Sequence, residues 1–254
     1  MLTDALAASA AELVRSGTEP TGLRIVLEPV IVPPGRGAYK GVMPPRMRWL
    51  HPAARLAYAA IADAVVVSDM YRSADSSLSA MQKKTGVLPP GFSRHGYGLA
   101  IDVSVSESMK LTGCKTKALF DAWMIARGWH CHRIDFAMKS EAWHYNFLMS
   151  WQWRKGEPST RAAGERQLSD LFGTAWRMDV AGEQRALAKL KMYNGNDDGK
   201  AGPLTLEARG VFHRAWLLKP TTPRSMYLRT LAFVAADLVT PEGKRIIPAL
   251  GVQP

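Results

Sequence analysis

The sequence predicts two structural units, an α+β domain with a small antiparallel sheet followed by an all-α helical domain. In residues 1–155, short strand-like apolar runs alternate with helix-like segments, whereas only helical spacing follows a cluster of turn formers at residues 156–160. The length of 254 residues exceeds the common size of one domain, and 47% hydrophobic residues suffice for a sizeable core. We therefore expect domains at residues 1–155 and 165–254, joined by a linker at residues 156–164.

The spacing of apolar residues predicts the elements of the first unit. Strict alternation of apolar and polar residues indicates a strand with one buried face, and apolar residues three and four apart indicate a helix. An Ala-rich stretch from Pro52 has helical spacing, with Leu56 on its apolar side. The expected elements are a strand at residues 23–27, a helix at 52–66, a strand at 65–70, a strand at 99–105, a helix at 116–127 and a strand at 143–147.

Two of the predicted strands carry side chains that can bind a metal. In the strand at residues 99–105, Asp102 lies on the face opposite apolar residues such as Ile101. In the strand at residues 143–147, His144 alternates with aromatic residues in the same way. If the two strands lie side by side, Asp102 and His144 come together on one polar face.

His95, Asp102 and His144 form a complete set of ligands for a hydrolytic zinc site. Such sites take three nitrogen or carboxylate ligands at roughly 2.0–2.2 Å and leave the fourth position to a water, which is the nucleophile. Glu141 stands three residues before His144, so a turn at residues 141–144 places it beside the metal as a base. We therefore expect one zinc ion per chain. The alternative is that His95 and His144 are ordinary histidines satisfied within the protein.

These residues resemble the zinc D-alanyl-D-alanine peptidases of the VanX and VanY type, whose pattern reads S-x-H-x-x-G-x-A-x-D and later E-x-W-H. The fixed positions are met by Ser93, His95, Gly98, Ala100, Asp102, Glu141, Trp143 and His144. Upstream, residues 65–73 resemble the family's strand ending in S-G-Y-R-S, with Asp69-Met70 in place of the single glycine. By this resemblance, Arg72 reaches the site and binds the substrate carbonyl or carboxylate.

The resemblance implies metal-assisted hydrolysis of a peptide bond. Zinc would lower the pKa of its water and polarise the scissile carbonyl, Glu141 would move the proton to the leaving amine, and Arg72 would stabilise the oxyanion. Ser93, Tyr97 and Trp143 are candidates for the substrate cleft. Hydrogen bonding within the loop is the alternative for Ser93 and Tyr97, and packing is the alternative for Trp143.

Further histidines and cysteines lie close to this pattern in the sequence. His130 and His132 stand at strand spacing, but no carboxylate motif accompanies them, so we expect a structural or ligand-supporting role. Cys114 and Cys131 do not make a disulfide framework, and we expect free buried thiols. Zinc ligation by Cys131 is the alternative.

The second unit reads as helices at residues 180–190, 204–216 and 222–239, with Leu206, Phe212 and Trp216 expected to be buried. This region resembles the three-helix peptidoglycan-binding module, whose pattern is L-Q-x-x-L, then D-G-x-x-G-P-x-T, then A-x-x-x-F. The central loop is matched by residues 198–205, and the flanking positions by Gln184, Leu187, Ala208 and Phe212. The alternative is a helical docking domain without a ligand.

The formal charge of +11 indicates attraction to polyanions such as an anionic cell envelope. No basic run interleaved with aromatic residues marks a specific nucleic-acid site, and no apolar stretch is long enough to span a membrane. The N-terminus has no basic region ahead of an apolar run, so we expect no secretion signal. We expect a monomer.

Together these features resemble a modular bacteriophage endolysin, a peptidoglycan peptidase that stays in the host cytoplasm until a holin releases it to the cell wall. The first alternative is a bacterial D-alanyl-D-alanine carboxypeptidase that trims wall precursors or stem peptides. Others are a catalytically dead wall-binding protein and a DNA-associated basic protein without zinc. The scissile bond stays open. From the two-domain reading we expect residues 1–160 alone to cleave small soluble muropeptides.

Overall fold

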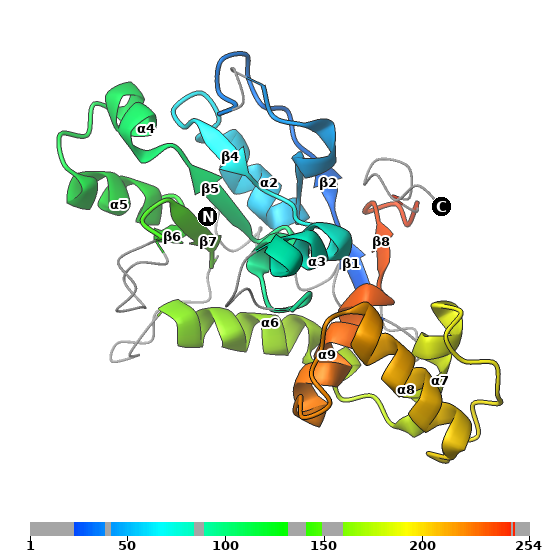
Figure 1. Ribbon diagram of the computed structural model, residues 1–254. Helices are drawn as coiled ribbons and strands as arrows, with labels where there is room; N and C mark the ends of the chain where they lie inside the picture. The colour runs from blue at the N-terminus through cyan, green and yellow to red at the C-terminus, as the bar shows by residue number, and fades with distance from the viewer. Residues whose placement is uncertain are drawn as a thin grey trace.

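A computed structural model of the chain describes residues 23–38, 42–83, 89–131, 141–148, 160–244 and 246, without the side chains of residues 160–164. The architecture is mixed α+β, which confirms the predicted class in its coarse form (Figure 1). The helices are α2 Pro52–Ala59, α3 Ala74–Lys83, α4 Val105–Thr112, α5 Lys117–Ile125, α6 Thr160–Trp176, α7 Val180–Lys189, α8 Pro203–Ala215 and α9 Arg224–Val234, with short 3-10 helices η1 Pro45–Met47 and η2 Arg94–Tyr97.

The main sheet has four antiparallel strands in the order β4-β5-β7-β6, which confirms the small antiparallel sheet. Its strands are β4 Val67–Asp69, β5 Ala100–Val103, β6 Trp129–Cys131 and β7 His144–Phe147. Two further ribbons accompany it, an antiparallel pair of β2 Glu28–Pro29 with β3 Trp49–Leu50 and a parallel pair of β1 Arg24–Val26 with β8 Asp237–Val239. The second pair joins segments from opposite ends of the described chain.

The elements of the first unit are shorter than expected, and two of them show where the chain departs from the predicted pattern. The helix predicted at residues 52–66 ends at Ala59, after which the chain makes consecutive turns that bury Ile61, and Leu56 is 47% exposed. The strand predicted at residues 99–105 ends at Val103, because Ser104 is the N-cap residue of α4. In both cases the apolar spacing that predicted the element continues in the sequence beyond the residue at which the element ends.

The second unit differs from the expectation at three places. Helix α6 begins at Thr160, so residues 160–164 of the predicted linker are helical, while residues 156–159 lie outside the described residues. The helix predicted at residues 222–239 ends at Val234, and the chain continues into β8. Leu206, expected to be buried, is 54% exposed.

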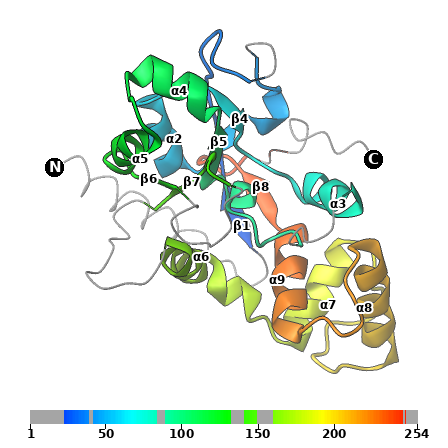
Figure 2. The same ribbon diagram turned by 60° about the vertical axis from the view of Figure 1, so that its left-hand side comes forward.

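The hydrophobic core does not divide at the predicted linker. The larger cluster surrounds the main sheet and includes Leu168 and Phe172 from α6 and Phe233 from α9. The smaller cluster joins α7, α8 and the other side of α9. Figures 1 and 2 show α7, α8 and α9 grouped at one end of the molecule, with the chain returning through β8 to lie beside β1. The expected boundary between domains at residues 1–155 and 165–254 therefore does not coincide with the division of the core.

A glycine ends the 3-10 helix that carries His95. Gly98 is the C-cap residue of η2 and has a φ of 65°, in the left-handed region that favours glycine. A Cβ at this position would lie 2.5 Å from the backbone nitrogen of His51. The chain before β5 is thus packed directly against the backbone that precedes α2.

We predict that Gly98→Ala destabilises the protein more than Gly113→Ala does. Gly113 has a similar φ of 70°, but a Cβ there would meet nothing within 4 Å. The left-handed conformation alone should cost about 1–2 kcal/mol in Gly113→Ala, and the backbone clash should add to that cost in Gly98→Ala. Denaturant unfolding of both variants measures the difference. Equal losses of stability would contradict the close packing at Gly98.

Candidate metal centre

Antiparallel pairing aligns three polar residues on one row across the main sheet. In the observed register, Asp69 on β4 lies opposite Asp102 on β5, and Asp102 lies opposite His144 on β7. Directly opposed residues of antiparallel strands share a face, with Cβ atoms about 4.5–5.5 Å apart. The predicted pairing of Asp102 with His144 is confirmed.

His95 joins this row from the 3-10 helix η2. Its Nε2 lies 3.2 Å from Asp102 Oδ1 and 3.1 Å from His144 Nδ1, and Nδ1 of His144 lies 2.8 Å from the same carboxylate oxygen. The His95 side chain is only 2% exposed, and those of Asp102 and His144 are 14% and 13% exposed. The ligand atoms of these residues all lie within 4.8 Å of one another, so the group could hold a metal ion.

Both imidazoles are oriented by acceptors on the side away from the cluster. His95 Nδ1 lies 2.7 Å from the carbonyl oxygen of Met70, and His144 Nε2 lies 2.9 Å from Asn146 Oδ1. Because a carbonyl oxygen only accepts, each of these ring nitrogens carries the proton and donates it. In the neutral rings, His95 Nε2 and His144 Nδ1 therefore present lone pairs to each other and to the carboxylate. Such outer hydrogen bonds are typical of histidines that bind metals.

The group fits a divalent cation in both spacing and charge. A tetrahedral ion such as zinc, with ligands at about 2.0–2.1 Å, needs ligand atoms roughly 3.3 Å apart, close to the separations of 2.8–3.2 Å between these three atoms. The charges of Asp69, Asp102 and Glu141 act on the Arg72 guanidinium and raise its pKa. The negative charges of these carboxylates favour a cation at the group.

The electrostatic field at the site favours positive charge. Burial alone would lower the pKa of His95, but Asp102 and Asp69 raise it above its ordinary value. Burial alone would raise the pKa of Asp102, but the neighbouring imidazoles lower it well below its usual range. The carboxylates would stabilise either a proton on the imidazoles or a metal ion bound to them, so metal binding must displace that proton.

Arg72 lies beside the cluster, and Asp69 holds its side chain. Arg72 Nη2 donates to Asp69 Oδ2 at 2.6 Å, and the Arg72 backbone nitrogen donates to the carbonyl oxygen of His95 at 3.2 Å. The register shifts between Val67 and Asp69, which is a bulge of one residue in β4. The two residues Asp69-Met70 that replace one glycine of the family pattern thus extend a bulged strand, where Met70 supplies the acceptor for His95.

Glu141 and Trp143 precede β7 in a tight turn. The backbone nitrogen of His144 donates to the carbonyl oxygen of Glu141 at 3.1 Å, so the turn on which the assignment of Glu141 depended is present. Glu141 is half-buried, and Arg72 lies within its electrostatic reach. Trp143 is 45% exposed and does not pack inward with the other aromatic residues of this segment. Its ring is therefore available to a bound molecule.

Ser93 and Tyr97 flank His95 but differ from the expected cleft positions. Tyr97 is fully buried, its hydroxyl donates to the carbonyl oxygen of Gly91 at 2.9 Å, and its ring stacks on Phe172. The structure thus places the Tyr97 side chain in the core, with the hydrogen bond within the loop that was the alternative for this residue. Ser93 is half-buried at the N-cap of η2 without a side-chain capping bond.

The remaining candidates lie outside the ligand group. His130 is buried opposite Asn146, and burial lowers its pKa to about 4, so it is a neutral structural residue. His132 lies outside the described residues. Cys114 and Cys131 are free thiols, as predicted, but Cys114 is only half-buried. An open hollow of about 430 Å³ also lies elsewhere, lined by Gly35, Arg36, Gly37, Ala38, Val66, Glu107, Lys110 and Leu111.

Sequence reasoning missed two residues that shape the cluster, Asn146 and Asp69. Asn146 follows His144 by two positions, so the period of a strand places both on one face, and this signal was available. Asp69 was visible only as a departure from the family pattern. Its role depends on the register of β4 against β5, which local spacing does not define.

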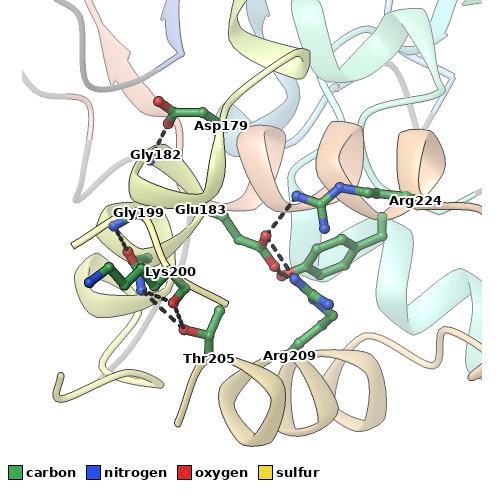
Figure 3. Close-up of polar contacts among 10 residues, drawn as sticks. Asp179, Gly182, Glu183, Gly199, Lys200, Thr205, Arg209 and Arg224 are labelled. Carbon is green, nitrogen blue, oxygen red and sulfur yellow. Dashed lines mark hydrogen bonds and ion pairs between the residues drawn. The ribbon is translucent and has the colours of Figure 1, made fainter. Parts of the chain in front are cut away.

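In the helical unit, Gln184 organises the loop of the second motif. Its buried Nε2 lies 3.0–3.1 Å from acceptors on Tyr193, Asp198, Lys200 and Thr205, and its Oε1 accepts from the backbone nitrogen of Gly199. Leu187, Ala208 and Phe212 pack in the smaller core cluster. Figure 3 shows this loop held against α7. These motif residues therefore build the loop, and they do not themselves form an exposed binding surface.

A buried carboxylate fixes the three helices next to that loop. The fully buried Glu183 of α7 accepts from Arg209 of α8 at 2.8 and 3.0 Å, from Arg224 of α9 at 3.0 Å and from Tyr227 at 2.7 Å (Figure 3). These charged hydrogen bonds lower the pKa of Glu183 although burial alone would raise it. The cluster is a structural tie between α7, α8 and α9.

Comparisons of the chain with protein-family models, with curated proteins and with solved structures give no significant match. Within the described residues, no helix combines the length and the apolar character needed to cross a lipid bilayer. The assignment of the site therefore depends on its own geometry.

We predict that the purified protein binds about one divalent metal ion per chain and that His144→Ala loses it. Removal of one of three ligands leaves too few donors for a stable site. Metal content after dialysis, measured by elemental analysis, tests this. His213→Ala, which changes a half-buried histidine of the helical unit, is the control and should keep the metal. Stoichiometric metal in His144→Ala would show that the ligand assignment is wrong.

Proposed function

We propose that this protein is a zinc-dependent peptidoglycan peptidase that cuts a peptide bond in the stem peptide or cross-link of the bacterial cell wall. The observation that carries the proposal is the convergence of three donor atoms, with both imidazoles fixed by outer acceptors. The half-buried carboxylate of Glu141 and the guanidinium of Arg72, which interact electrostatically, are the groups that we assign to proton transfer and to oxyanion binding. Peptide hydrolysis with a metal needs these components.

His95, Asp102 and His144 would hold the zinc ion. A bound zinc ion supplies a Lewis acid, which lowers the pKa of water and polarises a carbonyl. Met70 and Asn146 keep the lone pairs of the two imidazoles directed at the site. The donor set of two nitrogens and one carboxylate oxygen is typical of catalytic zinc sites that leave a position open.

Glu141 and Arg72 would act on the substrate itself. Glu141 would take the proton of the attacking water and deliver it to the leaving amine, a role that suits a carboxylate held in the turn before a ligand. Arg72 would bind the carbonyl oxygen as negative charge develops on it. Its ion pair with Asp69 limits the positions that the guanidinium can take, so less rotamer freedom is lost when substrate binds. The exposed ring of Trp143 and the hydroxyl of Ser93 are the proposed substrate contacts.

The helical unit would bind peptidoglycan, and the formal charge of +11 would favour the anionic envelope. The loop at residues 198–202 is exposed apart from the half-buried Gly202, and Gln184 holds it in a fixed conformation, as a recognition loop requires. Since wall binding by one part of the chain raises the local concentration of substrate for the other part, the combination suits an endolysin acting on intact walls.

Digestion of purified sacculi tests the proposed reaction. The soluble products are separated and identified by mass spectrometry, with a chelator-treated sample as the control. We expect new peptide termini on cross-linked muropeptides, which indicate an endopeptidase. Loss of only a terminal D-Ala would instead assign the carboxypeptidase reaction. Unchanged muropeptides with the zinc-loaded protein would contradict the proposed peptidase function.

We predict that Glu141→Gln keeps zinc and the folded structure but loses activity on the order of 10²–10⁴-fold, the usual contribution of a positioned acid or base. Glutamine has nearly the same shape but cannot take the proton. Zinc content and the rate of muropeptide cleavage are measured on the same preparation. Glu107→Gln, an exposed glutamate in α4, is the matched control and should retain wild-type activity. Near-normal turnover of Glu141→Gln would place the base elsewhere.

A further inference from the structure

Helix α9 belongs to both hydrophobic clusters. Tyr227, Leu228 and Leu231 pack in the smaller cluster with α7 and α8, while Ala232 and Phe233 pack in the larger cluster around the main sheet. Figures 1 and 2 show α9 lying between α6 and the α7–α8 pair. This helix is therefore a shared wall between the helical unit and the unit that carries the metal cluster.

Phe233 packs against the backbone that carries His95. A Cβ added to Gly96 would lie 2.5 Å from Phe233 Cζ, and one added to Gly91 would lie 2.9 Å from Phe233 Cβ. The Phe233 ring also meets Tyr97 edge-on, with ring centroids 5.2 Å apart. Gly91, Gly96 and Tyr97 thus lie directly on the Phe233 side chain, and Gly96 is the immediate neighbour of His95 in the chain.

Arg229, one turn earlier on α9, ties the same segment through hydrogen bonds. Its Nε donates to the carbonyl oxygen of Gly91 at 2.7 Å, and its Nη1 donates to Glu165 of α6 at 2.7 Å. The guanidinium lies over the ring of Trp176 at 4.1 Å. The Gly91 carbonyl oxygen also accepts from Tyr97, so Arg229 and η2 share one acceptor.

The segment between these contacts is itself a stiff turn. Gly98 donates to the His95 carbonyl at 3.1 Å and Leu99 donates to the Arg94 carbonyl at 3.0 Å, while His95 Nδ1 is fixed by Met70. A displacement of Gly96 would therefore move His95 as a unit with the turn. Ligand atoms separated by 2.8–3.2 Å tolerate little displacement before a metal is bound less tightly.

We propose that Phe233 and Arg229 are positioning residues that hold the His95 turn in its metal-binding conformation, so that the C-terminal helix is an integral part of the metal centre. The expectation that residues 1–160 act alone is thereby reversed, because that fragment lacks the helix on which the turn rests. The predicted effect on zinc affinity rests on the proposed zinc site, whereas the predicted effect on the conformation of residues 94–99 does not.

The test compares Phe233→Ala with Leu231→Ala in the full chain. Leu231 is fully buried on the same helix, but it faces the smaller cluster, so both variants remove a large buried side chain from α9. Zinc affinity is measured by competition with a chromophoric chelator, and amide hydrogen exchange of residues 94–99 is measured without metal. Circular dichroism verifies that each variant is folded under the conditions used.

We expect Phe233→Ala to weaken zinc binding on the order of 10-fold or more, as for other residues that orient ligands, and to accelerate exchange in residues 94–99. Leu231→Ala should leave both quantities near the wild-type values. If Phe233→Ala does not fold, Arg229→Met replaces it, since this change keeps the apolar stem and removes the bonds to Gly91 and Glu165.

Equal effects of the Phe233 and Leu231 substitutions would overturn the proposal, because they would reflect general destabilisation. Unchanged affinity and exchange in Phe233→Ala would overturn it as well. If the wild-type protein binds no zinc, the proposed zinc site fails, and exchange alone decides. Faster exchange of residues 94–99 confined to the Phe233 variant would then still support the positioning role.

Discussion

The antiparallel pairing of β4, β5 and β7 is the constraint on which the site depends. It places Asp69, Asp102 and His144 on one row, and it does so through backbone hydrogen bonds that are independent of these side chains. Directly opposed carboxylates repel each other. The cost is reduced by Arg72 on one side and by the two imidazoles on the other, and a divalent cation would remove most of what is left. The sheet thus gathers negative charge at a place where the group could hold a metal ion.

The sequence was most informative where local periodicity decides the structure. The alternation in β5 and β7 correctly predicted which face carries Asp102 and His144. The tight turn after Glu141 was a condition of its assignment, and it is present. The sequence could not show that Tyr97 is buried against Phe172, because that contact joins segments far apart in the chain. The contribution of Asp69 required the bulge in β4, which depends on pairing with a distant segment.

The errors at the last helix of the second unit have one cause, which is that helical periodicity does not say what a helix packs against. Apolar spacing continued beyond Val234, yet Leu238 lies in β8, where the strand pairs with β1. The partners are more than two hundred residues apart, so no local pattern could have joined them. Phe233 lies in the helix predicted at residues 222–239, yet it packs on Gly96 and Tyr97 of the other unit. Division of the chain by composition therefore separated parts that share one core.

The two sequence motifs carry different kinds of information about function. In the sheet unit, atoms of His95, Asp102 and His144 that can bind a metal lie 2.8–3.2 Å apart, and this arrangement favours a cation or a proton between them. In the helical unit, Gln184 and the residues that it bonds satisfy one another within the protein. A motif whose hydrogen bonds are internally satisfied explains how a loop keeps its shape, and it leaves ligand recognition to the exposed residues that the loop presents. The proposed wall binding is therefore tested by substitutions on that surface, and the proposed hydrolysis by substitutions in the motif itself.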